Sequence, residues 1–188
     1  MTTLINKIKR CTKCEMSATR THVVIGQGPL PCKIVFLGEA PGRKEDETGI
    51  PFSGPSGDLL EATAFKAGLK RGVDYHILNL LKCRPPENRD PTAEELLNCR
   101  DFLKQQLKKV QPRVIVAFGR YAQAFVMGMA SKDVKVLQNV GKVVPFTDGC
   151  RGVLSYHPAY VLRNRNTDML KGLESHMKLA KKLSKEVT

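Results

Sequence analysis

The sequence predicts an α/β fold: a three-layer α/β/α sandwich around a central, mainly parallel sheet of four strands. Short apolar runs alternate along the chain with longer segments in which apolar residues recur at helical spacing, and strands separated by helices pair in parallel. The runs are apolar throughout, as is typical of strands covered on both faces. A length of 188 residues with 41% hydrophobic residues suits one domain with a buried core.

The predicted strands are apolar runs that end at a glycine or at the start of a polar loop. They cover 33–38, 75–81, 113–118 and 152–155. Helices are predicted over 58–69, over 92–110, from Gly119 onward and over 169–183. The second helix has the clearest start, because Thr92 is followed three residues later by Glu95, the pattern of a capping box. We expect a single domain over 1–188, with an irregular N-terminal arm over 1–32 and a looser, basic stretch over 131–152.

The charge of the chain favours a polyanionic partner. Lys and Arg total 31 against 18 Asp and Glu, a formal net charge of +13. Such an excess suits nucleic acid or an anionic membrane surface. No apolar run reaches the roughly 20 residues of a membrane span, and neither a signal sequence nor a basic amphipathic anchor is visible. We therefore expect a cytoplasmic protein without a membrane partner, associated with the nucleoid if its polyanionic partner is DNA.

Two loops that follow predicted strands carry the candidate chemistry. In α/β sheets ligands bind at the carboxyl ends of the strands. The first loop contains Gly38-Glu39-Ala40-Pro41-Gly42 and, further on, Phe52 between glycines. It lacks the Gly-Lys-Ser/Thr of a phosphate-binding loop and the Gly-x-Gly-x-x-Gly of a dinucleotide site. What remains is a rigid loop that brings backbone close to a ligand and presents one aromatic ring.

The second loop runs from Ser155 to Arg163 and contains His157 at the end of the last predicted strand. His157 there is either catalytic or structural. The apolar pair Val161-Leu162, next to Arg163 and Arg165, is either a surface wedge flanked by phosphate contacts or an ordinary turn packed through its leucine.

Four of the six cysteines have a spacing that suits ligands. Cys11 and Cys14 form a short Cys-x-x-Cys pair, and Cys83 and Cys99 are separated by 15 residues. In a reducing compartment such cysteines are ligands, catalysts or buried residues rather than disulfides. Four thiolates hold zinc or an iron–sulfur cluster, while the alternative is simple burial. The remaining two, Cys32 and Cys150, stand alone and are interpreted as bystanders.

Four motifs together resemble the family 4 uracil-DNA glycosylases, the iron–sulfur branch of the uracil-DNA glycosylase superfamily. They are Gly38-Glu39-Ala40-Pro41-Gly42, Gly49-x-Pro51-Phe52-x-Gly54, Asn79-Leu80-Leu81-Lys82-Cys83-Arg84-Pro85-Pro86-x-Asn88-Arg89 and His157-Pro158-Ala159-Tyr160-x-Leu162-Arg163. The resemblance runs from Cys11 to the end of the chain, in the order of the family. It implies a monofunctional base excision repair enzyme that flips deoxyuridine out of single- or double-stranded DNA and hydrolyses its N-glycosidic bond.

The resemblance also implies a role for each residue of the uracil pocket. Phe52 corresponds to the residue that stacks on the flipped uracil, and Asn79 corresponds to the residue that reads its polar edge, with Gly38 and Ala40 beside them. His157 corresponds to the catalytic histidine, a hydrogen-bond donor to uracil O2. Ala40 lacks the polar side chain with which several branches of the superfamily position water, so Glu39 is our candidate for positioning the water or for bracing the pocket.

For the cofactor, the resemblance assigns Cys11, Cys14, Cys83 and Cys99 as ligands of a [4Fe–4S] cluster with a structural role. We expect the cluster to tie the N-terminal arm to the rest of the domain. Candidate DNA contacts around the pocket mouth are Arg84, Arg89, Val161, Leu162, Arg163 and Arg165. We expect a monomer, and no motif identifies a protein partner such as a sliding clamp.

Two alternatives stay open at this stage. One is a relative with altered damaged-base specificity, or one that traps abasic DNA covalently through a histidine in the loop after the third cysteine. The loop 85–89 contains no histidine, which favours ordinary turnover. The other is a non-catalytic iron–sulfur DNA-binding module, against which stand the intact Glu39, Phe52, Asn79 and His157.

Overall fold

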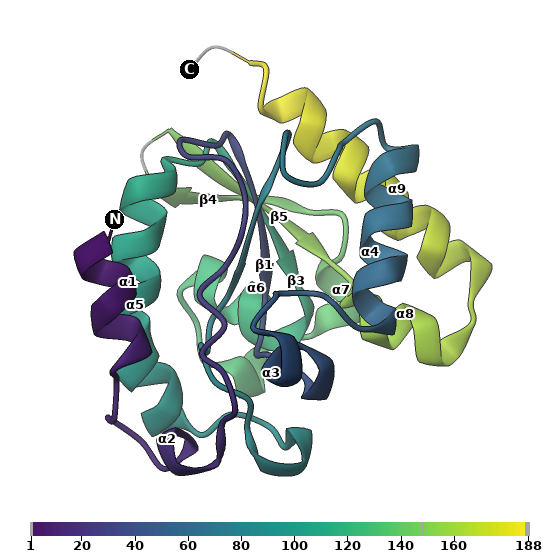
Figure 1. The fold of residues 1–188 in the computed structure, drawn as a ribbon. Helices are drawn as coiled ribbons and strands as arrows, with labels where there is room; N and C mark the ends of the chain where they lie inside the picture. The colour runs from purple at the N-terminus through teal and green to yellow at the C-terminus, as the bar shows by residue number, and fades with distance from the viewer. Residues whose placement is uncertain (1, 148, 187–188) are drawn as a thin grey trace.

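The computed structural model describes residues 2–147 and 149–186. Over these residues it contains a five-stranded sheet with the order β2-β1-β3-β5-β4 (Figure 1). The strands are β1 (Ile34–Gly38), β2 (His76–Asn79), β3 (Val114–Phe118), β4 (Val143–Thr147) and β5 (Cys150–Ser155). Strands β2, β1, β3 and β5 pair in parallel, and β4 runs antiparallel to β5. The α/β class and the parallel pairing of the four predicted runs are confirmed.

The predicted count of four strands is wrong by one, because β4 lies within the stretch 131–152 that we expected to be loose. Its residues alternate between exposed and half-buried, so it is an edge strand covered on one face only. Pro145 stands in its middle, and proline is tolerated in edge strands because one side of the backbone needs no ladder hydrogen bonds. This short, proline-containing alternation gave no strand signal.

Helices cover both faces of the sheet. On one face lie α4 (Pro55–Lys66), α8 (Pro158–Asn164) and α9 (Thr167–Leu183), which pack against one another and against β3 and β5. On the other face lie α5 (Ala93–Val110) and α6 (Gly119–Met127), with α1 (Thr2–Lys9) packed outside α5 (Figure 1). Alternate residues of β1 serve the two layers, since Phe36 packs into the first core cluster and Leu37 into the second. The structure thus has the predicted three layers.

Several shorter elements were not predicted. They are α2 (Met16–Thr19), α3 (Arg43–Thr48), α7 (Val136–Asn139) and the 3-10 turns η1 (Pro86–Asn88) and η2 (Ser131–Asp133). The segment after His157 forms α8, although we expected a loop.

The N-terminal arm is more ordered than the sequence indicated. Met1 of the predicted arm lies outside the described residues. Leu4 and Ile8, one helical turn apart in α1, are buried against Phe102 of α5. Further on, the amide of Val24 donates to the carbonyl of Lys82 at 2.8 Å, and Gln27 forms an antiparallel bridge with Ile77 of β2. The arm therefore runs along the outer edge of β2. Among the residues described here, no helix has the length and apolar character needed to cross a membrane.

Candidate active site

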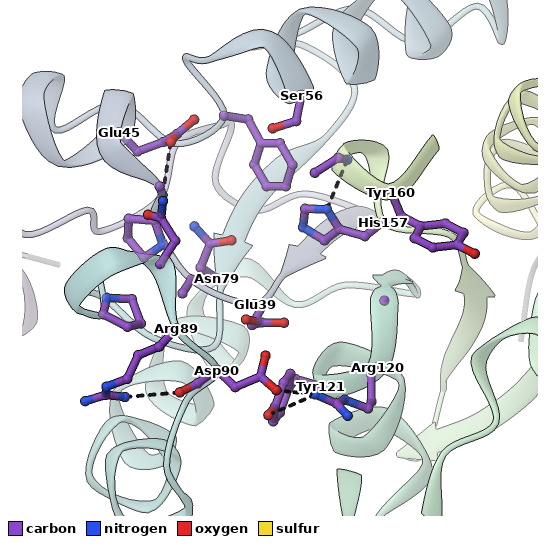
Figure 2. Close-up of a pocket in the computed structure, with 18 of the residues that line it drawn as sticks. Glu39, Glu45, Ser56, Asn79, Arg89, Asp90, Arg120, Tyr121, His157 and Tyr160 are labelled. Carbon is purple, nitrogen blue, oxygen red and sulfur yellow. Dashed lines mark hydrogen bonds and ion pairs between the residues drawn. The ribbon is translucent and has the colours of Figure 1, made fainter. Parts of the chain in front are cut away.

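A pocket of about 710 Å³ opens at the carboxyl edge of the parallel strands, where the loops after β1, β2, β3 and β5 meet. The predicted residues Glu39, Ala40, Phe52, Asn79 and His157 all line it. Figure 2 shows Asn79, Glu39 and His157 pointing into one shared space from three different strand ends. The structure thus brings together predicted residues that lie as much as a hundred positions or more apart in the sequence.

Asn79 offers the pocket an unsatisfied acceptor. It is the last residue of β2, paired in register with Gly38 of β1, and is 3% exposed. Its Oδ1 atom has no hydrogen-bond partner among the described residues. A buried amide oxygen without a partner is costly, so such a group is expected to receive a donor from a ligand. Gly38 leaves room for this geometry, because a Cβ there would overlap Asn79 Oδ1 and meet the Phe52 ring at 3.0 Å.

Phe52 is held in a strained backbone conformation beside Asn79. Its φ is 50°, in the left-handed region that bulky residues rarely adopt, and such strain is characteristic of functional sites. The side chain is 5% exposed, and its ring lies 6.0 Å from the His157 ring at an interplanar angle of 26°. Gly57 must be a glycine here, since a Cβ would overlap the carbonyl of Phe52.

Two charged side chains that the sequence did not single out support the Phe52 loop. Oε1 of Glu45 accepts hydrogen bonds from the amides of Ser53 and Gly54 at 2.9 and 3.0 Å. On the other side, Arg71 donates to the carbonyls of Pro51 and Phe52 at 2.6 and 3.1 Å. These bonds to the backbone compensate for the strained φ. The only sequence signal was the position of Glu45 three residues after Gly42, whose amide it also accepts at 3.0 Å.

The geometry of His157 fixes where its proton lies. It is the N-cap of α8, and its Nδ1 accepts a hydrogen bond from the amide of Ala159 at 3.1 Å. Burial lowers the pKa of His157 to about 4, and the charge of Arg163 lowers it further. The ring is therefore neutral at physiological pH, and because Nδ1 is an acceptor the proton is on Nε2. His157 presents a fixed N–H donor without a positive charge.

Glu39 lines the same pocket, near an ion pair to which a tyrosine hydroxyl is also bonded. Burial raises the pKa of Glu39 to about 7, the charge of Asp90 raises it further, and that of Arg120 lowers it. Asp90 pairs with Arg120 at 2.5 Å, and Arg120 also donates to the hydroxyl of Tyr121 at 3.3 Å (Figure 2). A carboxyl group with a pKa near 7 is suited to accept or hold a proton at neutral pH.

The predicted DNA-contact residues fall into two groups. Arg163 lines the pocket, and Arg165 and Leu162 are exposed on the same helix end, where Leu162 is 42% exposed. Val161, in contrast, is only 3% exposed and lies in the core. The prediction of a surface wedge is therefore wrong for Val161. Neighbouring residues of a helix point about 100° apart, so only Leu162 of the pair faces outward.

Arg89 lines the pocket, as expected, but its guanidinium is held by carboxylates. Its guanidinium bonds both oxygens of buried Glu95, at 2.7 and 2.9 Å, and Glu15 at 2.7 Å. Its charge is thus balanced by two carboxylates, and it joins the N-terminal arm to the start of α5. Among the described residues, Arg84, Arg163 and Arg165 form no ion pair. These three are the better candidates for phosphate contacts.

The four predicted ligand cysteines lie in or against two adjoining side-chain clusters. Cys83 and Cys99 are both 5% exposed and lie in one cluster with Met16 and Leu81, against which Cys14 packs. Cys11 lies at the adjoining cluster formed by α1 and α5. Burial raises the pKa of Cys14, and the charges of Cys99 and Cys11 contribute in the same direction, so the thiols share one region.

The donor set, four thiols with Arg20 beside one of them, suits an iron–sulfur cluster or zinc. Among the described residues, no group of three or more potential ligands is close enough to hold a metal ion. Zinc holds its sulfurs about 2.3 Å from one centre. A four-iron cluster instead binds each thiolate to a different iron, so its sulfurs are further apart. Arg20, which donates to Cys83 Sγ at 3.3 Å, supplies a positive charge that favours a thiolate. The bystanders Cys32 and Cys150 are buried in the core between α5, α6 and the sheet.

The pocket and its fold are those of a known superfamily. The model of the uracil DNA glycosylase superfamily matches residues 25–180, and the chain belongs to it. A "Type-4 uracil-DNA glycosylase" of Thermotoga maritima is 39% identical over 96% of this chain and 92% of its own length. One of Archaeoglobus fulgidus with the same description is 42% identical over 85% of this chain and 81% of its own length. A "Type-5 uracil-DNA glycosylase" of Pyrobaculum aerophilum is 34% identical over 76% of the chain and 67% of its own length. Within the superfamily, the chain belongs to the type-4 family.

Proposed function

We propose that the protein is a DNA repair glycosylase that releases uracil from DNA by hydrolysing the N-glycosidic bond of flipped deoxyuridine. One observation carries this proposal. The same pocket contains an unsatisfied acceptor, Asn79 Oδ1, a neutral donor, His157 Nε2–H, and a buried aromatic ring. Membership of the type-4 family supports the same activity.

The pocket selects uracil through hydrogen bonds and stacking. The amide of Asn79 accepts from N3–H of uracil at its unsatisfied Oδ1 and donates to O4 from Nδ2. Cytosine presents the reverse pattern, an acceptor at N3 and a donor at N4, and is rejected. Stacking of the flipped base on Phe52 adds about 1–3 kcal/mol, which helps to offset the few kcal/mol that unstacking costs.

His157 acts on the leaving group. As the bond between C1′ and N1 breaks, negative charge grows on the uracil ring, particularly at O2. A neutral donor fixed by the α8 N-cap geometry binds this charge more strongly in the transition state than in the ground state. Because its pKa is low, His157 keeps its proton at Nε2 and stabilises uracil as an anion rather than protonating it.

The attacking water is positioned by Glu39 in this proposal. Ala40 offers no polar side chain, whereas Glu39 lies on the pocket wall with a pKa of about 7. In its ionised form the carboxylate accepts a hydrogen bond from the water whose oxygen forms the new bond to C1′. It takes the proton that this water loses, which leaves an abasic deoxyribose and the uracil anion; the anion gains a proton from solvent, and Glu39 returns its proton to solvent.

We further propose that Cys11, Cys14, Cys83 and Cys99 hold a [4Fe–4S] cluster. Bound to these residues, the cluster supplies a covalent tie between the N-terminal arm, the loop after β2 and α5. In the single domain expected over 1–188, the cluster would then join the N-terminal arm to the rest of the chain, at the end that lies away from α9. Arg84, Arg163 and Arg165 contact phosphates of uracil-containing DNA, with Leu162 at the site vacated by the flipped base. The monomeric state and the cytoplasmic, nucleoid-associated location stay predictions.

A labelled oligonucleotide with a single uracil tests the proposed function. Incubation with the protein and then alkali is expected to cut the strand at that position, in single-stranded, U·A and U·G forms, while the matched thymine oligonucleotide stays intact. Binding without cleavage would instead support the non-catalytic DNA-binding module. Cleavage at another damaged pyrimidine, but not at uracil, would support a relative with altered specificity.

A further inference from the structure

An exposed leucine, Leu137, lines the pocket and has no role in the proposed function. It lies in the short helix α7 and is 57% exposed, compared with 42% for Leu162 of α8. Its neighbour Val136 lines the same pocket. Single apolar residues are common on protein surfaces, but these two border a binding pocket. An apolar side chain in such a place is expected to be covered when the ligand binds.

The segment that carries Leu137 is held at both ends. Before α7, the side chain of Val134 is buried, with 8% exposure. After α7, the amide of Gly141 donates to the carbonyl of Leu154 in β5 at 2.8 Å. Between these points, α7 packs against α6 and β5. The backbone therefore fixes the outward position of Leu137 at the rim of the pocket.

The surface around Leu137 is basic. Lys132 and Lys135 precede it and Lys142 follows it, and all three lysines are exposed. Between Lys132 and Lys142 the sequence has a single acidic residue, Asp133. Within the described part of the chain, no carboxylate forms an ion pair with these lysines. Exposed lysines contact phosphates, so an apolar residue among them suits the base or sugar of a nucleotide.

The flipped nucleotide determines what lies over this rim. In the proposed function, uracil passes through the mouth to the base-binding residues, yet its sugar stays joined to the two neighbouring nucleotides of the strand. Those neighbours must therefore lie at the rim. Tyr160 and Arg163 of α8 line the pocket from one layer of helices, whereas Leu137 lines it from α7, which packs against α6 of the other layer. The strand thus meets an exposed leucine at α8 and another at α7.

We propose that α7 is a second DNA-contacting element. Leu137 packs against the nucleotide next to the flipped uracil in the same strand, and Lys135 contacts its phosphate. This inference rests on the proposed function. Leu162 occupies the gap in the base stack of a duplex, so its role needs a complementary strand. Leu137 instead acts on the strand that contains uracil, and it contributes equally to the binding of single-stranded and double-stranded DNA.

The test compares Leu137→Ala with Leu97→Ala. Leu97 is 65% exposed on α5, is not among the residues that line the pocket, and is the matched control. Affinity is measured for single-stranded and duplex oligonucleotides with one 2′-fluorinated deoxyuridine, since the fluorine disfavours positive charge on the sugar and slows cleavage. We expect Leu137→Ala to bind both forms about tenfold more weakly, because a buried leucine contact is lost. The single-turnover rate of uracil release at saturating protein stays at the control level.

The phosphate contact is tested through salt dependence. In Lys135→Ala, the slope of log affinity against log salt concentration should become shallower by about one, as expected for one lost phosphate contact. Lys104→Ala, on the exposed face of α5, should keep the wild-type slope. An unchanged slope in Lys135→Ala would contradict the phosphate contact.

The outcomes for Leu137→Ala separate a lost contact from the alternatives. Control-level affinity for both oligonucleotides would overturn the proposal. Weaker binding of the duplex alone would contradict the contact with the uracil-containing strand. A lower single-turnover rate at saturating protein would show a distorted pocket instead of a lost DNA contact. The proposed function itself fails on a different result, namely that wild-type protein binds the fluorinated deoxyuridine oligonucleotide no better than the matched thymidine oligonucleotide.

Discussion

The proposed uracil pocket and the cysteine region both adjoin the loop after β2, but they are built differently. The pocket residues stand at the ends of strands, or in a loop clamped by Glu45 and Arg71, so regular backbone fixes them. The cysteines come from three segments, the arm, the loop after β2 and α5, which side-chain contacts and ion pairs join. One such connection is the ion pair of Arg89 with Glu15, and Glu15 is largely exposed.

This difference indicates what each region needs. The pocket is preformed. Its energetic cost is visible in the strained φ of Phe52 and the unsatisfied Asn79 Oδ1, the two residues that bind the base in the proposed function. The cysteine region is assembled from three separate segments, which the proposed cluster would tie together. Changes in the pocket should therefore affect chemistry and leave the fold intact, whereas changes at the cysteines should affect the fold first.

The largest effect is expected for His157→Ala. Loss of one donor to the transition state lowers the single-turnover rate of uracil release by about 10²–10³-fold, or ~2.7–4 kcal/mol. Abasic-duplex affinity and thermal stability stay close to wild type, because the pocket is held by other residues. A large drop in melting temperature would show instead that His157 is a structural N-cap, and the comparison above would fail.

The cysteine side is tested by Cys99→Ser, with Cys150→Ser as the matched control. Both cysteines are only 5% exposed, but only Cys99 is an expected ligand. We expect Cys99→Ser to lose the visible absorption of the cluster and its iron, and to unfold at a clearly lower temperature, since metal binding contributes to folding. Cys150→Ser should keep both. Equal loss of iron in the two variants would contradict the assignment of ligands.

The smallest effect concerns Glu39 and is a change in the pH profile. With a pKa of about 7, the carboxylate is protonated below that pH, so kcat/KM of the wild type should fall about tenfold per pH unit below 7. Glu39→Gln should lose this acidic limb and give a flat, lower profile. A variant that keeps both the wild-type rate and the limb would remove Glu39 from the mechanism.

Periodicity along the sequence predicts the parallel core, since four apolar runs became β1, β2, β3 and β5 and the helices between them cover both faces. It failed for β4, where Pro145 and half-exposed residues hide an edge strand, and for α1, which buries only Leu4 and Ile8. In both cases the element packs through one face only, and that face has too few apolar residues to give a periodic pattern in the sequence.

For the site, the strand-end rule and the family motifs predicted which residues gather, but not what holds them. Arg71 supports Phe52 through backbone carbonyls about 20 positions away in the sequence. Asp90, in the loop after η1, and Arg120, at the start of α6, adjust the pKa of Glu39. Such contacts depend on backbone atoms and on charges brought together by folding, which no local pattern records. The burial of Val161 and the pairing of Arg89 were missed for the same reason.

The central claim is that His157 is a neutral imidazole with its proton on Nε2. The most direct measurement is a pH titration of the ¹⁵N-labelled histidine rings by NMR, with His157→Ala used to assign the signal. The account predicts a protonated Nε2 and an unprotonated Nδ1, without change from pH 8 down to about pH 5, and protonation of the ring only near pH 4. A ring that titrates near its ordinary pKa of about 6.5, or one that carries its proton on Nδ1, would contradict it.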